Sequence, residues 1–243
     1  ARDGVLELVQ LLRVHGRSLD AFTSQSAAEG GHLHILRWLV AEGCALYGEI
    51  SRAAGAGGHL EILKWLRSKG SPWQESICSG AARGGHLHVL QWAMAQGCPC
   101  DLEACNAAAR GGQLEALQWI RGQGCSWDRS TSAAAAEGGS LEVLLWMKEE
   151  GCSWNQSVCR IAASAGHLEA LQWLRGEGFH WDEWTCSEAA RRGHLEVLKW
   201  CRSQGCPWDK HRQCKVAAGA GHLEVLFWLR AEGCPWDAGT CSG

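Results

Sequence analysis

Apolar and polar residues along positions 193–209 (GHLEVLKWCRSQGCPWD) follow the spacing of a helix. Five apolar side chains fall on one broad stripe: Leu195, Val197, Leu198, Trp200 and Cys201. A stripe of this width is expected when neighbours cover a helix on several sides. Glu196 in the first turn and Arg202 in the last both favour the helix dipole. Gly205 then predicts a helix end in the left-handed conformation.

A shorter, alanine-rich segment precedes each of these helices. In TCSEAARR, residues 185–192, two adjacent alanines allow a neighbouring helix to approach closely. The pair recurs along the chain, at Ala81-Ala82, Ala108-Ala109, Ala135-Ala136, Ala162-Ala163, Ala189-Ala190 and Ala217-Ala218. A turn of one or two glycines leads from the short helix into the long one. The pattern therefore predicts a helix–turn–helix unit followed by a brief extended connector.

The glycine before each long helix recurs with a fixed period. The step is 27 residues throughout, except for a last step lengthened by one inserted residue near Lys210. These glycines are Gly4, Gly31, Gly58, Gly85, Gly112, Gly139, Gly166, Gly193 and Gly221. A short period is typical of stacked arrays, in which each unit buries its apolar face against a neighbour. We predict a single all-α solenoid of about eight repeats over 1–243, with a partial unit at 1–22, repeats of about 27 residues from 23 onward and an incomplete last unit.

The two ends of the sequence lack polar capping units. The chain enters directly on a long helix at Gly4, with apolar Val5 and Leu8 close by, and it stops at Cys241 just inside a new short helix. Solenoids need terminal units with a polar outer face. We therefore expect this chain to be a segment of a longer protein, or its ends to be covered by neighbours.

Charge and hydropathy narrow the choice of partners. The net charge is −3 and the isoelectric point is near 6.4. A general binder of nucleic acid needs a surplus of Lys and Arg for phosphate contacts, so we expect no nucleic acid partner. The sequence has no apolar run long enough to cross a membrane and no visible signal peptide, so we expect no membrane association.

Most of the 14 cysteines occupy two columns of the repeat. One column follows the long helix: Cys44, Cys98, Cys125, Cys152, Cys206 and Cys234. The other lies in the short helix: Cys78, Cys105, Cys159, Cys186, Cys214 and Cys241. Packed helices lie about 8–10 Å apart, whereas a disulfide needs Cα atoms within about 7 Å, so equivalent cysteines of adjacent units cannot pair. We interpret them as small buried residues of a protein in an intracellular, reducing compartment, the cytoplasm or the nucleus.

Tryptophan also follows the period. One column lies on the long helix: Trp38, Trp65, Trp92, Trp119, Trp146, Trp173, Trp200 and Trp228. A second follows the turn: Trp73, Trp127, Trp154, Trp181, Trp208 and Trp236. An aromatic row could stack on bases, but the first column lies on the apolar stripe. We therefore interpret both columns as the core between repeats.

The sequence contains only weak candidates for metal-binding or catalytic residues. Six histidines follow the repeat glycine, one in each of six units, and pairs such as His86/His88 are two residues apart, a spacing at which helical side chains do not face each other. Cys98, Cys100 and Cys105 come nearest to a zinc-ligand spacing, but no second ligand pair lies near them. No Ser/His/Asp or Cys/His arrangement stands apart from the repeat. We predict no catalytic residue, metal, cofactor or small-molecule substrate, and zinc- or thiol-dependent activity remains the weakest alternative.

The repeat resembles a known family. Its string AAxxGHLEVLxWLxxxGCPWD is similar to the second half of the ankyrin repeat, AAxxGHxxVVxLLLxxGADVN, and this likeness covers essentially the whole chain. It looks like the short, Trp- and Cys-rich variety found in protist, algal and giant-virus proteins. The period is 27 rather than the usual 33 residues, which implies shortened hairpins between repeats. The resemblance implies an ankyrin-like fold and a non-catalytic scaffold that binds a protein partner through its concave face and connectors.

In that family the two residues after the alanine pair, together with the connector before the short helix, face the concave side. Trp184 is the one tryptophan outside both columns, and Arg191, Arg192 and Arg212 are its expected neighbours. Aromatic and arginine side chains are favoured interface anchors. The candidate partner-binding residues are Arg83, Arg110, Arg129, Glu137, Glu183, Trp184, Arg191, Arg192, His211 and Arg212. The main alternative is an architectural subunit of a large assembly, with contacts spread over its surface.

Overall fold

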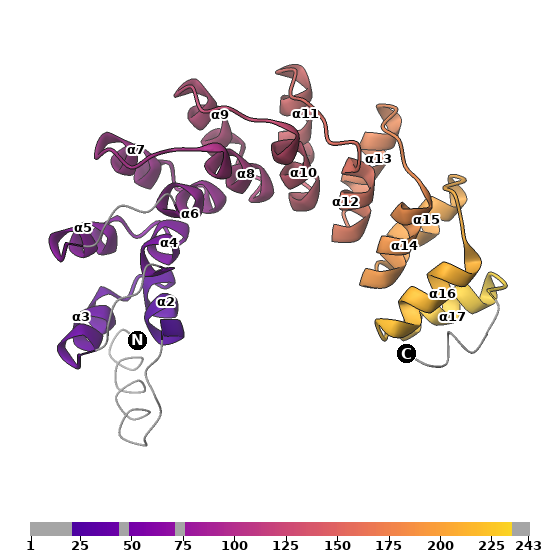
Figure 1. The fold of residues 1–243 in the computed structure, drawn as a ribbon, viewed down its shortest axis with the longest axis horizontal. Coiled ribbons are helices and arrows are strands. Elements are labelled where there is room, and N and C mark those ends of the chain that lie inside the picture. The colour runs from indigo at the N-terminus through magenta and orange to yellow at the C-terminus, as the bar shows by residue number, and fades with distance from the viewer. Residues whose placement is uncertain (1–20, 44–48, 71–75, 235–243) are drawn as a thin grey trace. The chain divides into compact units, whose positions relative to one another are not determined.

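The computed structural model describes residues 21–43, 49–70 and 76–234, in which helices occur and strands do not (Figure 1). The chain divides into two compact units, Ala1–Ser126 and Trp127–Gly243. The first unit contains α2 (Ala21–Glu29), α3 (Leu33–Ala41), α4 (Glu49–Ala56), α5 (Leu60–Ser68), α6 (Ser76–Gly84), α7 (Leu87–Ala95), α8 (Leu102–Arg110) and α9 (Leu114–Gly122). The second contains α10 (Arg129–Gly138), α11 (Leu141–Glu149), α12 (Val158–Ala165), α13 (Leu168–Gly176), α14 (Glu183–Arg192), α15 (Leu195–Ser203), α16 (Lys210–Gly219) and α17 (Leu223–Ala231).

Within each unit the helices form two layers. The expected difference in helix length is wrong, because α10, α14 and α16 have ten residues, α12 has eight, and α11, α13, α15 and α17 have nine each; the names short and long helix are kept here for the alanine-rich member of each pair and its partner. In the second unit the short helices α10, α12, α14 and α16 pack side by side, and each is followed by its long-helix partner (Figure 1). In the first unit α2, α4, α6 and α8 form the corresponding row. The predicted all-α helical repeat solenoid is confirmed. The predicted count of units and their outer boundaries stay predictions.

Glycines end the helices of the repeat, and aspartates cap the beginnings of several of them. Gly193 and Gly205 have φ of +80° and +72°, the left-handed region that only glycine enters at low cost, so each reverses the chain after a helix. Asp182 begins α14 with a capping box, accepting hydrogen bonds from the backbone N–H groups of Trp184 and Thr185. Aspartates at the same place cap α8, α10 and α16, which explains why an aspartate recurs at the end of these connectors.

The core lies between the two layers. In α15 it is formed by Val197, Leu198 and Cys201, which face the alanine pair Ala189-Ala190 of α14. The same three positions of the long helix and the same alanines are buried in the repeat of α12 and α13, whereas Leu226 and Ala218 in the repeat of α16 and α17 are half-buried. Because alanine adds little bulk, the short helices approach each other closely and leave the larger apolar side chains to the long helices.

The sequence interpretation placed both tryptophan columns in the core between repeats. The indoles do join successive repeats, but they lie at the edge of the core and not at its centre. Trp200 and the other described long-helix tryptophans are half-buried, and in the second column Trp181 is buried whereas Trp127, Trp154 and Trp208 are half-buried. Indoles of the two columns meet edge to face between successive repeats, with ring centroids 5.5 Å apart for Trp181 and Trp200 and 5.3 Å apart for Trp127 and Trp146. The indoles therefore cover the outer edge of the core, where a connector crosses a long helix.

Histidines after the repeat glycine link successive repeats. Nε2 of His194 lies 3.0 Å from the carbonyl oxygen of Ser164, and Nε2 of His86 lies 2.9 Å from that of Ala56. The structural role expected for these histidines is confirmed. One detail was wrong, because the rings of His86 and His88 lie 6.0 Å apart and do face each other. His86 is the non-helical N-cap, so the spacing rule for helical side chains does not apply to it.

None of the helices in the described ranges has both the length and the apolar character needed to cross a membrane. Several sequence-based expectations fall outside the described residues. They are those for Gly4, Val5, Leu8, Cys44, Trp73, Trp236 and Cys241.

Candidate functional site

Trp184 lies on the first turn of α14, and 45% of its surface is exposed. Its position follows from the cap, since the carboxylate of Asp182 accepts the Trp184 backbone N–H at 3.1 Å. The guanidinium carbon of Arg212, on α16, lies 4.1 Å from the indole centroid in a cation–π contact. Arg212 also lies 4.0 Å from the carboxylate of Glu183. Trp184 is thus held in place on one side and open to solvent on the other.

An open pocket of about 450 Å³ lies beside this indole. Its lining, here called the Trp184 pocket, consists of Arg160, Ile161, Ser164, Trp184, Glu188 and Arg191. Nε of Arg191 donates to the Glu188 carboxylate at 3.2 Å, and the Arg160 guanidinium donates to the Ser157 hydroxyl at 3.1 Å. The pocket combines an aromatic wall, one aliphatic side chain and two arginines.

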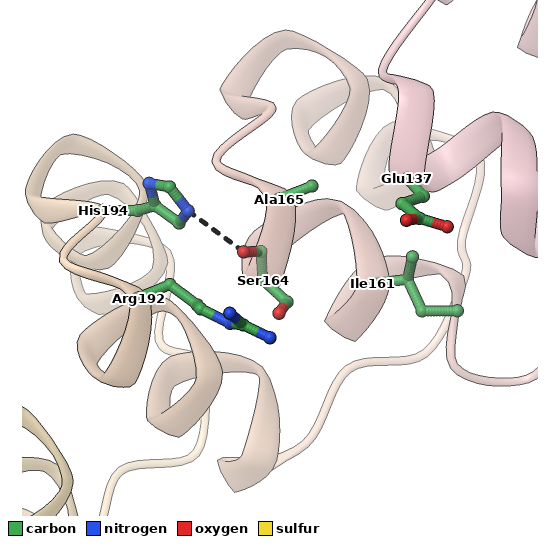
Figure 2. Close-up of a pocket in the computed structure, with 6 residues that line it drawn as sticks. All are labelled: Glu137, Ile161, Ser164, Ala165, Arg192 and His194. Atoms are coloured by element: carbon green, nitrogen blue, oxygen red, sulfur yellow. Dashed lines mark hydrogen bonds between the residues drawn. The ribbon is translucent and has the colours of Figure 1, made fainter. Parts of the chain in front are cut away.

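A second open pocket, of about 500 Å³, adjoins the first. Its lining, here called the Arg192 pocket, consists of Glu137, Ile161, Ser164, Ala165, Arg192 and His194. Figure 2 shows Arg192 reaching in from α14 and Glu137 from α10, with Ser164 and Ile161 between them. Among the described residues, Arg192 has no hydrogen-bond or ion-pair partner, so its charge is free to meet a ligand. Ile161 and Ser164 line both pockets, which makes the two a continuous surface.

The structure brings together part of the predicted set. Trp184, Arg191, Arg192, Arg212, Glu183 and Glu137 all lie on or beside the two pockets. His211 is exposed at the start of α16, and Arg129 is exposed at the start of α10. Arg83 and Arg110 belong to the first unit, where Arg110 lies 3.9 Å from Glu103. These last four residues line neither pocket.

Three pocket residues were missed by the sequence analysis: Arg160, Ile161 and Glu188. All lie just before the alanine pair of their helix rather than after it. A signal was present, because Ile161 and Glu188 occupy a column that holds Gly80, Ala107 and Ala134 in earlier repeats. A change from small to large side chains in one column indicates a surface that has been reshaped.

The cysteines considered for zinc do not gather into one cluster. Cys98 lies 3.4 Å from Cys78, sulfur to sulfur, whereas Cys105 joins no group of ligands among the described residues close enough to share a metal ion, and burial raises its pKa to about 12. A hydrogen bond from Cys78 lowers the pKa of Cys100 to about 7. Every cysteine in the described residues is a free thiol, and all but Cys100 are buried.

Known proteins resemble this chain in sequence and in fold. A family model described as ankyrin repeats (many copies) matches residues 159–201. The ankyrin repeat domain of human ASB11, a crystal structure, superimposes with a TM-score of 0.50 and 18% identity, over 65% of this chain and 84% of that one. A comparison with curated protein sequences gives no match.

These findings confirm the resemblance drawn from the repeated Ala-Ala and Gly-His segments. The matched residues 159–201 include most of α12 and α15 and the whole of α13 and α14, and α12 and α14 supply most of the lining of the two pockets. Residues 159–201 therefore match ankyrin repeats in sequence, and the chain has the fold of an ankyrin-repeat solenoid.

Proposed function

We propose that this chain is a non-catalytic scaffold that binds a protein partner through the Trp184 and Arg192 pockets. Ankyrin repeats generally mediate protein–protein interaction, which supplies the general class. The observation that carries the proposal is a half-exposed tryptophan beside two adjoining pockets with arginine in their walls. Tryptophan and arginine are the side chains most enriched at the energetic centre of protein interfaces.

The chemistry of the pockets suggests what the partner offers. Ile161 and the Trp184 indole present apolar surface, so an apolar side chain of the partner fits between them. Arg192 has a free guanidinium at the edge of the same surface, and a carboxylate is its natural bidentate partner. We infer an acidic segment with an apolar anchor residue.

Free, buried thiols support a reducing, intracellular location for this interaction. Their burial also supports a structural role, since the thiols lie among apolar side chains and not in the two pockets.

The test compares the proteins captured by immobilised wild-type chain and by matched single variants. Trp184→Ala and Arg192→Ala are expected to lose one discrete partner while keeping the wild-type unfolding temperature. Arg83→Ala is the control for arginine, because Arg83 lies in the first unit in the column of Arg191. Phe227→Ala is the control for an exposed aromatic, because Phe227 lies on α17 and is 72% exposed.

The pattern of losses separates the two leading functions. Loss with Trp184→Ala and Arg192→Ala, and retention with both controls, supports a scaffold with a localised site. Equal, small losses with all four variants would contradict the proposal and favour an architectural subunit with diffuse contacts.

A further inference from the structure

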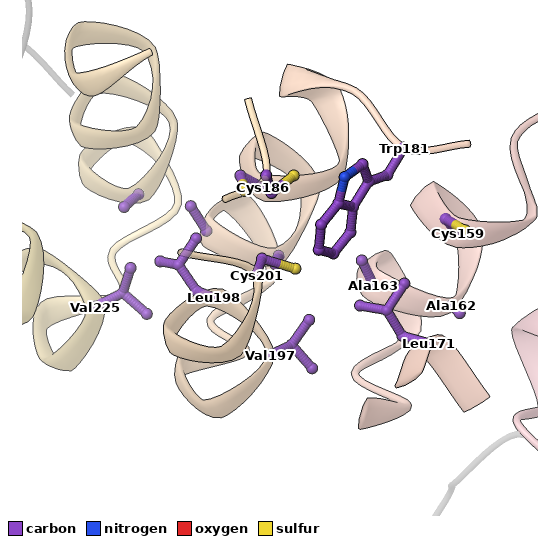
Figure 3. Close-up of a cluster of buried hydrophobic side chains, with 14 of the residues drawn as sticks. Cys159, Ala162, Ala163, Leu171, Trp181, Cys186, Val197, Leu198, Cys201 and Val225 are labelled. Carbon is purple, nitrogen blue, oxygen red and sulfur yellow. The ribbon is translucent and has the colours of Figure 1, made fainter. Parts of the chain in front are cut away.

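Three thiols meet in the core beneath α14. They belong to Cys186 on α14, Cys201 on α15 and Cys206 in the connector after α15, and their sulfur atoms all lie within 4.8 Å of one another. All three side chains are buried. Figure 3 shows Cys186 and Cys201 among the apolar side chains of this core. Of the described residues, these three form the one group of His, Cys, Asp or Glu side chains placed closely enough to share a metal ion.

The cluster arises because two columns meet and a third cysteine is added. Cysteines of the two columns approach each other inside one repeat, as Cys78 and Cys98 do at 3.4 Å. The third position, on the long helix, is aliphatic or methionine in the other described repeats: Leu39, Leu66, Ala93, Ile120, Met147, Leu174 and Leu229. Cys201 alone converts a pair of thiols into a triad. The repeat does not need a thiol there for packing, since apolar residues without a thiol fill that position elsewhere.

The number of ligands indicates which kind of ion the triad suits. Three sulfurs about 2.3 Å from one ion lie about 4 Å from one another in a planar arrangement, which the observed spacing permits. Structural zinc needs four ligands in a tetrahedron, and no fourth His, Cys, Asp or Glu among the described residues joins this group. Soft thiolate ligands select copper(I), which accepts three sulfurs without a fourth ligand.

We propose that Cys186, Cys201 and Cys206 form a three-sulfur binding site for copper(I). Binding replaces thiol protons, which are released to solvent as Cu–S bonds form, with no change in the oxidation state of copper or sulfur. The surrounding apolar side chains, Trp181 and Leu198 among them, keep water and oxidants away from the ion.

The experiment loads the reduced chain anaerobically with copper(I) and challenges it with a copper(I) chelator. Wild-type protein is expected to retain one ion more than Cys201→Leu, a variant that restores the residue found at Leu174 and Leu229. Cys201→Ala serves as a second variant in case leucine overfills the site, and circular dichroism checks the fold of each. Cys159→Ala is the matched control, since Cys159 is a buried thiol outside the triad and its connector partner position holds Phe179.

Sulfur coordination gives a second measurement. X-ray absorption of the retained copper is expected to show three sulfur neighbours in wild-type protein. Leu229→Cys is expected to create one additional site, because Leu229 stands to Cys214 and Cys234 as Cys201 does to Cys186 and Cys206.

Several outcomes would overturn the proposal. One is equal retention by wild type and both folded Cys201 variants, and another is an equal loss with Cys159→Ala. A preference for zinc(II) over copper(I) would also overturn it, as would a folded Leu229→Cys variant that gains no ion.

Discussion

Helix α6 of the first unit and helices α12 and α14 of the second differ at one column, the position before the alanine pair. In the first unit this position of α6 is Gly80, and a Cβ added there would lie 2.5 Å from the carbonyl oxygen of Arg52 on α4. In the second unit the same position is Ile161 in α12 and Glu188 in α14, and both side chains line the Trp184 pocket. The same repeat therefore has closely packed helices around Gly80 and a pocket beside Ile161. Side-chain size in one column determines which face forms.

At this column, the largest loss of stability is expected when a large side chain replaces Gly80. Gly80→Ile forces a large side chain against the α4 backbone, which cannot move aside like a flexible side chain, so we expect a loss of about 3 kcal/mol in the free energy of unfolding. Ile161→Ala, at a half-buried position, should cost about 1 kcal/mol. Urea unfolding monitored by circular dichroism measures both. If both variants lose a similar free energy of unfolding, the two surfaces tolerate a change of side-chain size equally well, and the proposed difference between them is wrong.

A second prediction concerns the caps of α8 and α14. Asp101 accepts the backbone N–H groups of Glu103 and Ala104, as Asp182 does those of Trp184 and Thr185, so Asp101→Ala and Asp182→Ala should each cost about 1 kcal/mol. Both losses are measured by chemical unfolding. Partner capture should distinguish the two variants, because Asp182 also positions Trp184. If Asp101→Ala weakens capture as much as Asp182→Ala, the binding surface is not confined to the second unit.

Much of the fold follows from the sequence because the repeat restates its pattern in every unit. The period, the alanine pairs and the turn glycines each predict the same two-layer arrangement, and the structure has it. The five-residue apolar stripe of α15 was less informative, since its period does not show which members face the centre. Val197, Leu198 and Cys201 are buried in the interior, whereas Trp200 is half-buried at the edge of the core.

Only part of the candidate site could be predicted from the sequence, for a similar reason. Trp184, Arg191, Arg192 and Arg212 stood out as departures in residue type, and they lie on or beside the two pockets. Ile161 changes only in size and went unnoticed. The thiol triad was missed because equivalent cysteines of adjacent repeats were compared, whereas Cys186 and Cys206 meet across two columns of one repeat. Contacts between different columns depend on how a unit folds back on itself, which periodicity alone does not reveal.

A third, smaller effect is expected from Trp184 itself. Because the indole is 45% exposed and packs mainly against Arg212, Trp184→Ala should change the free energy of unfolding by less than about 1 kcal/mol. Trp181→Ala, which removes a buried indole three residues earlier, should cost about 3 kcal/mol or more. Thermal and urea unfolding compare the two. A Trp184 variant as unstable as the Trp181 variant would mean that Trp184 belongs to the core and is unavailable to a partner.

The smallest effect is a pH dependence at the first helix of the second unit. Hydrogen bonds from the side chain and then the backbone of Ser130 lower the pKa of Asp128 below its ordinary value of 3.8. A carboxyl group whose pKa is lower in the folded chain than in the unfolded chain stabilises the fold at pH values above the unfolded pKa. That contribution is lost as the pH falls from near 3.8 through the lowered folded pKa. Asp128→Asn keeps a capping side chain without the titrating charge, so the difference in stability between wild type and this variant should shrink steadily over that acid range. Urea unfolding of both proteins at a series of pH values measures the difference, and a difference that stays constant would show that the Ser130 hydrogen bonds do not favour the ionised form of Asp128.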